Sequence, residues 1–137
     1  MKITIRSTIV TILFALISAL LVSCSGSGSG GDDDQAKVKY QAELEDGRAE
    51  CITRLKYRDD NGNLHTLYEI DELPWSKIIY VNDGAHIYLY AEVECDWLSI
   101  YLYINNKLIE RKNSYSFRTI EGNLRIDEEG NATFEEI

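Results

Sequence analysis

The chain of 137 residues has few of the residues from which catalytic and metal sites are built. It contains only two histidines, His65 and His86, and no CxxC, HExxH, GxSxG or Gly-rich phosphate-binding motif. Such motifs set nucleophiles, metal ligands or backbone N–H groups at the spacing that their chemistry needs. We therefore expect a protein that is not an enzyme and that binds no metal and no cofactor.

Basic residues are also scarce, with 14 Lys and Arg against 23 Asp and Glu. Binding to phosphates requires clustered Lys and Arg, so we do not expect nucleic acid as a partner. The many carboxylates do not by themselves indicate acid and base catalysis, because a chain this acidic carries them on any solvated face.

One acidic stretch imitates the first half of a calcium-binding loop. Asp59, Asn61 and Asn63 have the spacing of the first three ligands. Leu64 stands where such a loop has glycine, and Ile70 occupies the place of the bidentate glutamate. The sequence therefore predicts a plain hairpin turn here.

Long apolar runs are missing except near the N-terminus. Lys2 and Arg6 precede an apolar segment from Ile9 to Val22 that only one Thr and one Ser interrupt. This segment is shorter than the roughly 20 residues that a helix needs to cross a bilayer. A positive start, a short apolar middle and small residues near the end predict a secretory signal over residues 1–23. An uncleaved membrane helix or a buried core helix is the alternative.

The signal ends in Leu21-Val22-Ser23-Cys24. This tetrad resembles the lipobox of bacterial lipoproteins, which implies cleavage before Cys24 and a thioether from Cys24 to diacylglycerol. Two or three acyl chains, at about 0.8 kcal/mol per buried CH₂, give lasting attachment to membrane lipid. A free or disulfide-bonded Cys24 is the alternative.

A linker is expected over residues 24–35. Ser25 to Gly31 is purely Gly and Ser, which behaves as flexible coil. The coil has a reach of roughly 18 Å. The acidic block Asp32 to Asp34 is similar to the acidic residues after the cysteine of surface-exposed lipoproteins in some Gram-negative bacteria, although it also suits a solubilising linker. Ser25 fits the outer membrane better than the inner one, so we expect an outer-membrane lipoprotein that faces the periplasm or the cell surface.

Cys51 and Cys95 are the other two cysteines. In an exported protein they can form a disulfide. Nothing in the sequence shows that they meet, and burial as small hydrophobic thiols is the alternative.

Residues 36–137 are expected to form an all-β domain. Short runs rich in Tyr, Ile, Leu and Val alternate with turn residues every eight to twelve positions, which is typical of an antiparallel sandwich or barrel. We favour a small immunoglobulin- or transthyretin-like β-sandwich of about seven strands. The expected strands are Val38 to Glu45, Ala49 to Tyr57, Leu64 to Ile70, Trp75 to Val81, His86 to Val93, Trp97 to Ile104 and Lys107 to Asn113. The tail from Asn123 to Ile137 is expected to form a last hairpin around Asp127 to Gly130.

Alternation assigns faces to two of these strands. Alternate residues of a strand point to opposite sides. The aliphatic residues, expected in the core, are Ile87, Leu89, Ala91, Val93, Leu98, Ile100, Leu102 and Ile104. The opposite side carries Tyr88, Tyr90, Trp97, Tyr101 and Tyr103. These aromatic residues are candidates for one flat binding surface. Cross-strand stabilisation by tyrosines, covered by the tail from Tyr115 onward, is the alternative.

Pro74 and Trp75 mark the start of a strand. Proline donates no ladder hydrogen bond and disfavours helix at the residue before it. We expect Trp75 to plug one end of the sandwich, since a buried Trp is routine in such cores.

The stretch from Arg54 to Asn113 resembles the MmpS-type family of small membrane-tethered bacterial proteins. The matching features are Tyr57 ahead of Asp60-Asn61-Gly62, the run Leu73-Pro74-Trp75-Ser76-Lys77, the Gly84 turn, and Ile104-Asn105-Asn106-Lys107. The resemblance implies a compact periplasmic β-sandwich, and some members assist RND-type exporters of lipidic or siderophore cargo. This chain has a lipobox where such members have a transmembrane helix.

These observations together predict a non-catalytic lipoprotein that is an accessory or binding module of the cell envelope, such as one that assists an exporter complex. The alternative function is a surface module that binds a glycan or a host protein through the tyrosine-rich face.

Overall fold

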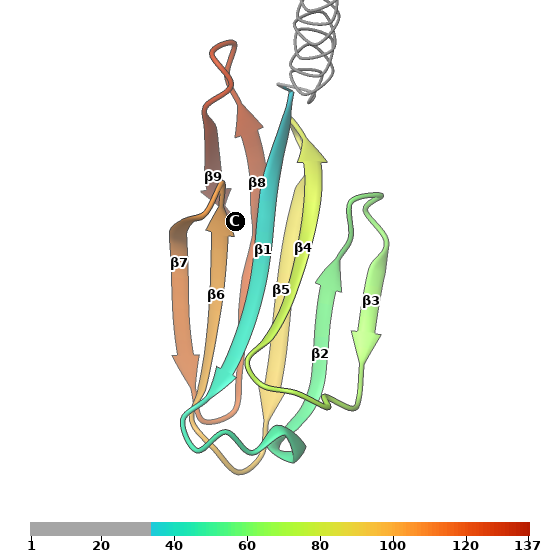
Figure 1. Cartoon of the computed structure of the whole chain (residues 1–137), viewed down its shortest axis with the longest axis vertical. Helices are drawn as coiled ribbons and strands as arrows, with labels where there is room; N and C mark the ends of the chain where they lie inside the picture. The colour runs from blue at the N-terminus through green and yellow to red at the C-terminus, as the bar shows by residue number, and fades with distance from the viewer. Residues whose placement is uncertain (1–33) are drawn as a thin grey trace, which may run out of the picture. The chain divides into compact units, whose positions relative to one another are not determined.

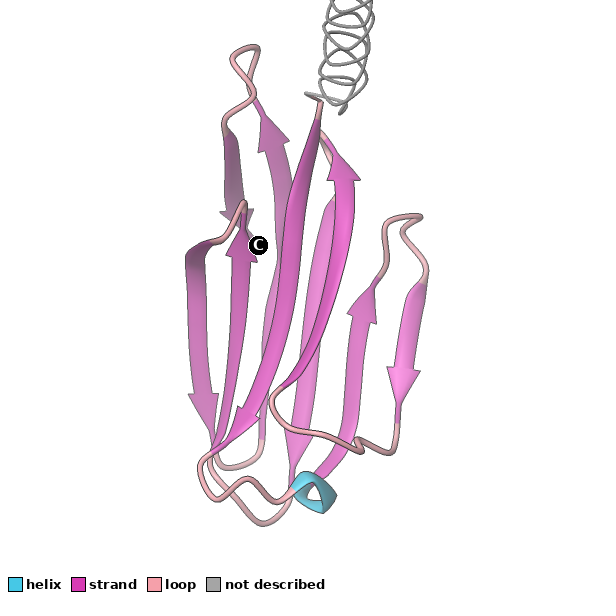
Figure 2. Cartoon of the chain, viewed as in Figure 1, coloured by secondary structure: helices cyan, strands magenta, loops and turns pink. Residues whose placement is uncertain are grey.

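A computed structural model describes residues 34–137, which form an all-β domain (Figures 1 and 2). The expected all-β class is confirmed, with nine strands where about seven were expected. The strands are β1 (Gln35–Leu44), β2 (Ile52–Arg58), β3 (Leu64–Leu67), β4 (Trp75–Asn82), β5 (His86–Val93), β6 (Leu98–Ile104), β7 (Lys107–Ser114), β8 (Phe117–Ile126) and β9 (Ala132–Glu136), and a short 3₁₀ helix, η1 (Ala49–Cys51), precedes β2. The expected signal over 1–23 and the lipidation at Cys24 lie outside the described residues.

Two antiparallel sheets make up the sandwich. One has four strands in the order β4-β1-β6-β7, and the other has five in the order β3-β2-β5-β8-β9. Figure 1 shows the four-stranded sheet nearer to the viewer and the centre of the five-stranded sheet behind it. Among residues 34–137, no helix is long and apolar enough to cross a membrane.

The core lies between the sheets and follows the predicted alternation. All eight aliphatic residues expected to face inward on β5 and β6 are buried. Tyr40 of β1 is also fully buried, and its hydroxyl donates a hydrogen bond to the Arg58 carbonyl oxygen at 3.1 Å. Trp75 begins β4 directly after Pro74 and packs against the core, with its ring centroid 5.5 Å from that of Tyr57.

The first part of strand β8, residues 117–122, was not predicted from the sequence. Residues 117–123 of this strand pair with β5, so that Ile120 lies opposite Leu89, and the strand buries Ile120 and Leu124. Only these two large aliphatic residues of the strand are fully buried, and Gly122 and Asn123 break the pattern of strand-forming residues between them. The expected hairpin around Asp127 to Gly130 is confirmed, because β8 and β9 pair across it.

The hairpins β2–β3 and β8–β9 use the same five-residue turn, Asp-x-x-Gly-Asn. In the first turn, Asp59 Oδ1 accepts the N–H groups of Asn61 at 2.9 Å and Asn63 at 2.8 Å. In the second, Asp127 Oδ1 accepts those of Glu129 and Asn131 at the same two distances. In both turns, the Oδ1 oxygen of the aspartate is thus occupied by backbone donors. The expected hairpin turn over Asp59 to Asn63 is confirmed, because β2 and β3 pair antiparallel across it.

The four edge strands differ in how they are protected from pairing with another chain. Strand β3 has four residues, β9 has five and ends in Glu135 and Glu136, and β7 carries an extra residue, Ile109, that shifts its register against β6. Short length, charge and bulges all discourage pairing between edges. Strand β4 has eight residues, a regular register with β1 and a single charged side chain, Lys77. It is the most accessible edge among these four.

Candidate functional site: an aromatic groove on the four-stranded sheet

The structure divides the predicted tyrosine surface between two faces of the sandwich. Tyr88 and Tyr90 lie on β5, in the five-stranded sheet, whereas Tyr101 and Tyr103 lie on β6, in the four-stranded sheet. Because the two sheets pack with their inner faces together, their outer faces point in opposite directions. The prediction of one surface containing all five aromatic residues is therefore wrong. Alternation along a strand specifies which side is buried, but not the sheet to which the strand belongs.

Trp97 and Tyr101 are brought together with charged side chains. They line a hollow of about 270 Å³, which we call the aromatic groove; its lining residues are Glu43, Leu44, Glu45, Trp97, Ser99, Tyr101 and Arg111. Trp97, Ser99 and Tyr101 share the outer side because the residues between them, Leu98 and Ile100, are buried. Arg111 of β7 lies directly opposite Tyr101 in the strand register.

Tyr101 is the centre of the polar contacts in the groove. Its hydroxyl donates a hydrogen bond to Glu43 Oε2 at 3.1 Å, and the Arg111 guanidinium carbon lies 5.5 Å from its ring centroid. Burial, and after it the hydrogen bond to Glu43, raises the pKa of Tyr101. Arg111 lines the groove, and its guanidinium forms no ion pair within the described part of the chain.

Two further aromatic rings lie beyond the two ends of the groove. The centroids of Tyr101 and Tyr103 lie 6.2 Å apart, and Lys39 Nζ lies 4.2 Å from the centroid of Tyr103. At the other end, the rings of Trp97 and Tyr115 are 4.2 Å apart. Tyr115, which is 72% exposed, was not among the predicted site residues, because the sequence placed it only at the start of a covering tail.

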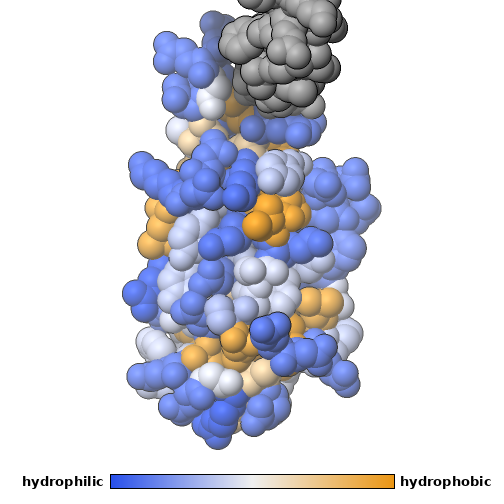
Figure 3. Space-filling model, in the orientation of Figure 1, coloured by the Kyte–Doolittle hydropathy of each residue, from blue (hydrophilic) through white to orange (hydrophobic). Residues whose placement is uncertain are grey.

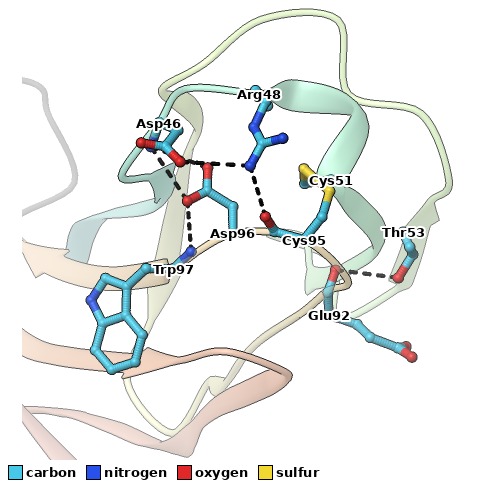
Figure 4. The surroundings of a disulfide bond; sticks show 8 residues. All are labelled: Asp46, Arg48, Cys51, Thr53, Glu92, Cys95, Asp96 and Trp97. Atoms are coloured by element: carbon cyan, nitrogen blue, oxygen red, sulfur yellow. Dashed lines mark hydrogen bonds and ion pairs between the residues drawn. A yellow bond between two sulfur atoms is a disulfide. The ribbon is translucent and has the colours of Figure 1, made fainter.

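The disulfide between Cys51 and Cys95 anchors the segment that carries Trp97. The structure pairs the two cysteines, which the sequence left open, and so joins η1 to the connection between β5 and β6. Arg48 strengthens this junction by donating a hydrogen bond from Nη2 to the Cys95 carbonyl oxygen at 2.9 Å. Figure 4 shows the bridge, with the indole ring of Trp97 directed away from it.

Asp96 holds the backbone on either side of the groove wall. Asp96 is 8% exposed, and its carboxylate accepts the N–H groups of Trp97 at 2.7 Å and Asp46 at 3.1 Å (Figure 4). The Glu45 N–H in turn donates to the Trp97 carbonyl oxygen at 3.0 Å. The end of β1 and the start of β6 are thus fixed to each other, and with them Glu45 and Trp97.

On the outer face of the five-stranded sheet, the polar side chains hydrogen-bond to one another. Glu92 Oε2 accepts hydrogen bonds from Arg54 Nη2 at 2.7 Å and from the Tyr90 hydroxyl at 3.0 Å. These bonds, first that from Arg54 and then that from Tyr90, hold the pKa of Glu92 below its usual range. Tyr90 also stacks on Phe117, with centroids 6.0 Å apart. The cluster is typical of cross-strand stabilisation.

The histidines are held apart, each beside a different carboxylate. His65 Nε2 lies 2.6 Å from Asp59 Oδ2, and His86 Nε2 lies 2.9 Å from Glu121 Oε1. The first pair belongs to the β2–β3 hairpin and the second joins β5 to β8. Neither pair lines the aromatic groove.

None of the turn and core features on which the resemblance to MmpS-type proteins rests lines this groove. The ligand of the groove therefore has to be argued from its own side chains. No model of a known protein family matches the chain, and no curated protein matches it.

Proposed function

We propose that the protein is a lipid-anchored, non-catalytic binding module of the bacterial cell envelope. The Cys51–Cys95 disulfide is the observation that carries this proposal. Structural disulfides form and persist in oxidising compartments outside the cytoplasm. An exported domain is what the leader and the Leu21-Val22-Ser23-Cys24 tetrad predict, and its first strand begins at Gln35, shortly after that cysteine.

The braced groove supports a binding role. Binding sites combine aromatic walls with a few placed polar groups and are usually formed before the ligand arrives. Trp97 and Tyr101 provide the walls, and the disulfide and Asp96 hold Trp97 in place. A role as the accessory of an envelope complex, such as an exporter, is the part of the proposal that the MmpS-type resemblance supports.

Replacement of Cys24 tests the anchor. In the bacterial host, Cys24→Ala should move the protein from the membrane to the soluble fraction and abolish labelling by radioactive palmitate. Ser25→Ala, which leaves the cysteine intact, is the matched control and should remain in the membrane. Membrane attachment and labelling that persist in Cys24→Ala would refute the lipid anchor.

Separation of the two membranes tests the location. We expect the wild-type protein in the outer-membrane fraction of a sucrose gradient. Digestion of intact cells by an added protease then distinguishes a domain on the cell surface, which is degraded, from a periplasmic one, which is protected. Recovery in the inner-membrane fraction would contradict the proposed location.

A further inference from the structure

We propose that the aromatic groove binds an uncharged glycan, with one sugar ring lying against Trp97 and Tyr101. This inference rests on the proposed binding function, for which it names the class of ligand, but it does not depend on the lipid anchor.

The walls of the groove suit the apolar faces of a sugar. A pyranose ring presents C–H groups on its faces and hydroxyls around its edge, and aromatic side chains bury large apolar area while their geometry stays fixed. Trp97 and Tyr101 line one hollow, and Tyr103 and Tyr115 continue the row of rings at its two ends. A chain of sugars therefore finds further aromatic surface beyond the first ring.

The polar side chains suit the hydroxyls at the edge of a sugar. Arg111 offers only donors, whereas the carboxylates of Glu43 and Glu45 offer only acceptors. A hydroxyl group both donates and accepts, so a pair of neighbouring hydroxyls satisfies both kinds of side chain at once. Arg111, which has no carboxylate partner among the ion pairs of the described residues, is free to donate.

The charge of the groove selects against acidic sugars. Two carboxylates and one guanidinium line it, so a uronate or sialate would meet net repulsion at close range. The chain as a whole has a formal net charge of −9, which adds to this repulsion at long range.

The size and setting of the groove favour a glycan over a protein surface. A hollow of about 270 Å³ has room for a small ligand such as one or two sugar rings. Figure 3 shows that hydrophobic side chains on this side of the molecule lie as separate patches among hydrophilic ones. The Cys51–Cys95 disulfide holds the groove in place and so lowers the entropic cost of ordering it when a ligand binds. A low ordering cost matters most for a weakly bound ligand such as a sugar.

Affinity electrophoresis tests the proposal. The full-length protein, held in a detergent without sugar groups, is run through native gels that contain laminarin, mannan, dextran, arabinoxylan or polygalacturonate. We expect slower migration in at least one of the four neutral polysaccharides and none in the anionic polygalacturonate. No retardation in any neutral gel, or retardation in polygalacturonate alone, would overturn the proposal.

Variants assign the binding to the groove. Tyr101→Ala should weaken binding about tenfold or more, because it removes one stacking ring. Tyr101→Phe keeps the ring, loses only the hydrogen bond to Glu43, and should bind within a few-fold of wild type. Tyr88→Ala, on the opposite face, is the matched control and should bind like wild type. Equal retardation of wild type and Tyr101→Ala, with both folded by near-UV circular dichroism, would overturn the assignment.

These outcomes are independent of the anchor. Fractionation of Cys24→Ala reports on membrane attachment, whereas the gels report on the groove. A protein that is anchored but not retarded refutes the glycan site alone, and a retarded protein that is not anchored refutes the lipid anchor alone.

Discussion

The Cα atoms of Cys51 and Cys95 lie 5.3 Å apart, although 44 residues separate them in the chain. Their disulfide closes a long loop, and it joins η1 to the segment that leads into Trp97. Stability of the fold and position of the groove wall therefore depend on the same bond.

Removal of both cysteines should lower the stability of the domain. We expect the double variant Cys51→Ala, Cys95→Ala to lose about 2–5 kcal/mol of the free energy of unfolding, because its unfolded chain is no longer restricted by the loop. Urea unfolding followed by circular dichroism measures the change. Reduced wild-type protein is the control and should unfold close to the double variant. Equal stability of oxidised wild type and variant would contradict the expectation.

Asp96→Ala should loosen Trp97. The substitution leaves the N–H groups of Trp97 and Asp46 without their acceptor in a nearly buried site, at a cost of about 1–3 kcal/mol. In a Trp75→Phe background, Trp97 is the only tryptophan, so its fluorescence should shift to longer wavelength. Glu94→Ala, at an exposed neighbouring position, should leave both stability and fluorescence unchanged. An unshifted spectrum in Asp96→Ala would show that the carboxylate does not position Trp97.

Gly122→Ala should displace β9. A Cβ atom at residue 122 would overlap the Glu135 carbonyl oxygen and the Phe134 ring, both on β9. We expect a loss of about 1–3 kcal/mol in the free energy of unfolding from this overpacking. Thr119→Ala, on the same strand, is the control for the loss of a partly exposed side chain. Hydrogen exchange should show faster exchange in β9 for Gly122→Ala, and wild-type rates there would contradict the clash.

The turn aspartates should make the domain sensitive to acid. The hydrogen bond from His65 comes first, and backbone hydrogen bonds follow, in holding the pKa of Asp59 below its ordinary value of 3.8; the side chain of Asn131 and the backbone do the same for Asp127. A carboxyl group with a lowered pKa in the folded state contributes stability above its unfolded pKa and loses it as the pH falls. We expect the urea concentration at the midpoint of unfolding to decrease once the pH drops below about 4.

The double variant Asp59→Asn, Asp127→Asn isolates this effect. It has no carboxyl group at either turn, so its urea midpoint should fall less than that of wild type between pH 5 and pH 2.5. Asp60→Asn, whose carboxylate accepts no backbone N–H in the same turn, is the matched control and should behave like wild type. Parallel pH profiles for wild type and the double variant would count against a role of the two turns.

Tyr40 should account for part of the loss of stability at alkaline pH. Burial raises the pKa of Tyr40 far above its ordinary value of 10.0. In the unfolded chain the phenol of Tyr40 ionises near pH 10, whereas in the folded chain it stays neutral there. The stability that the neutral phenol contributes is therefore lost as the pH rises through and above that value. Tyr40→Phe should be less stable than wild type at neutral pH, since it loses the bond to Arg58, but its stability should decline less above pH 10. Identical declines would contradict this assignment.

Residue type and alternation were enough to predict β1 to β7 and to identify the buried faces of β5 and β6. This succeeded because Ile87 to Val93 and Leu98 to Ile104 each alternate without interruption, and burial of one face is a local property of a strand. The first part of β8 was not predicted, because Gly122 and Asn123 weaken its pattern of strand-forming residues. The strand forms through its long-range pairing with β5.

The candidate site was only partly predictable. Trp97, Tyr101 and Tyr103 were named correctly as residues of one outer face, but Tyr88 and Tyr90 belong to the other. The short connection that carries Cys95 crosses from one sheet to the other, and no local signal in the sequence distinguishes such a crossing from a hairpin within one sheet. Glu43 comes from β1, which is remote in the sequence, and Arg111 comes from β7, the next strand after β6. The register of β1, β6 and β7 brings both residues to Tyr101.

The accessible edge of β4 has a consequence for the geometry of a pair of copies. Strand β4 runs antiparallel to β1, with Asn82 opposite Gln35. Two copies that pair antiparallel through their β4 edges point their β1 starts in opposite directions. In such a pair, the chains that lead into the two β1 strands approach the joined sheet from opposite ends.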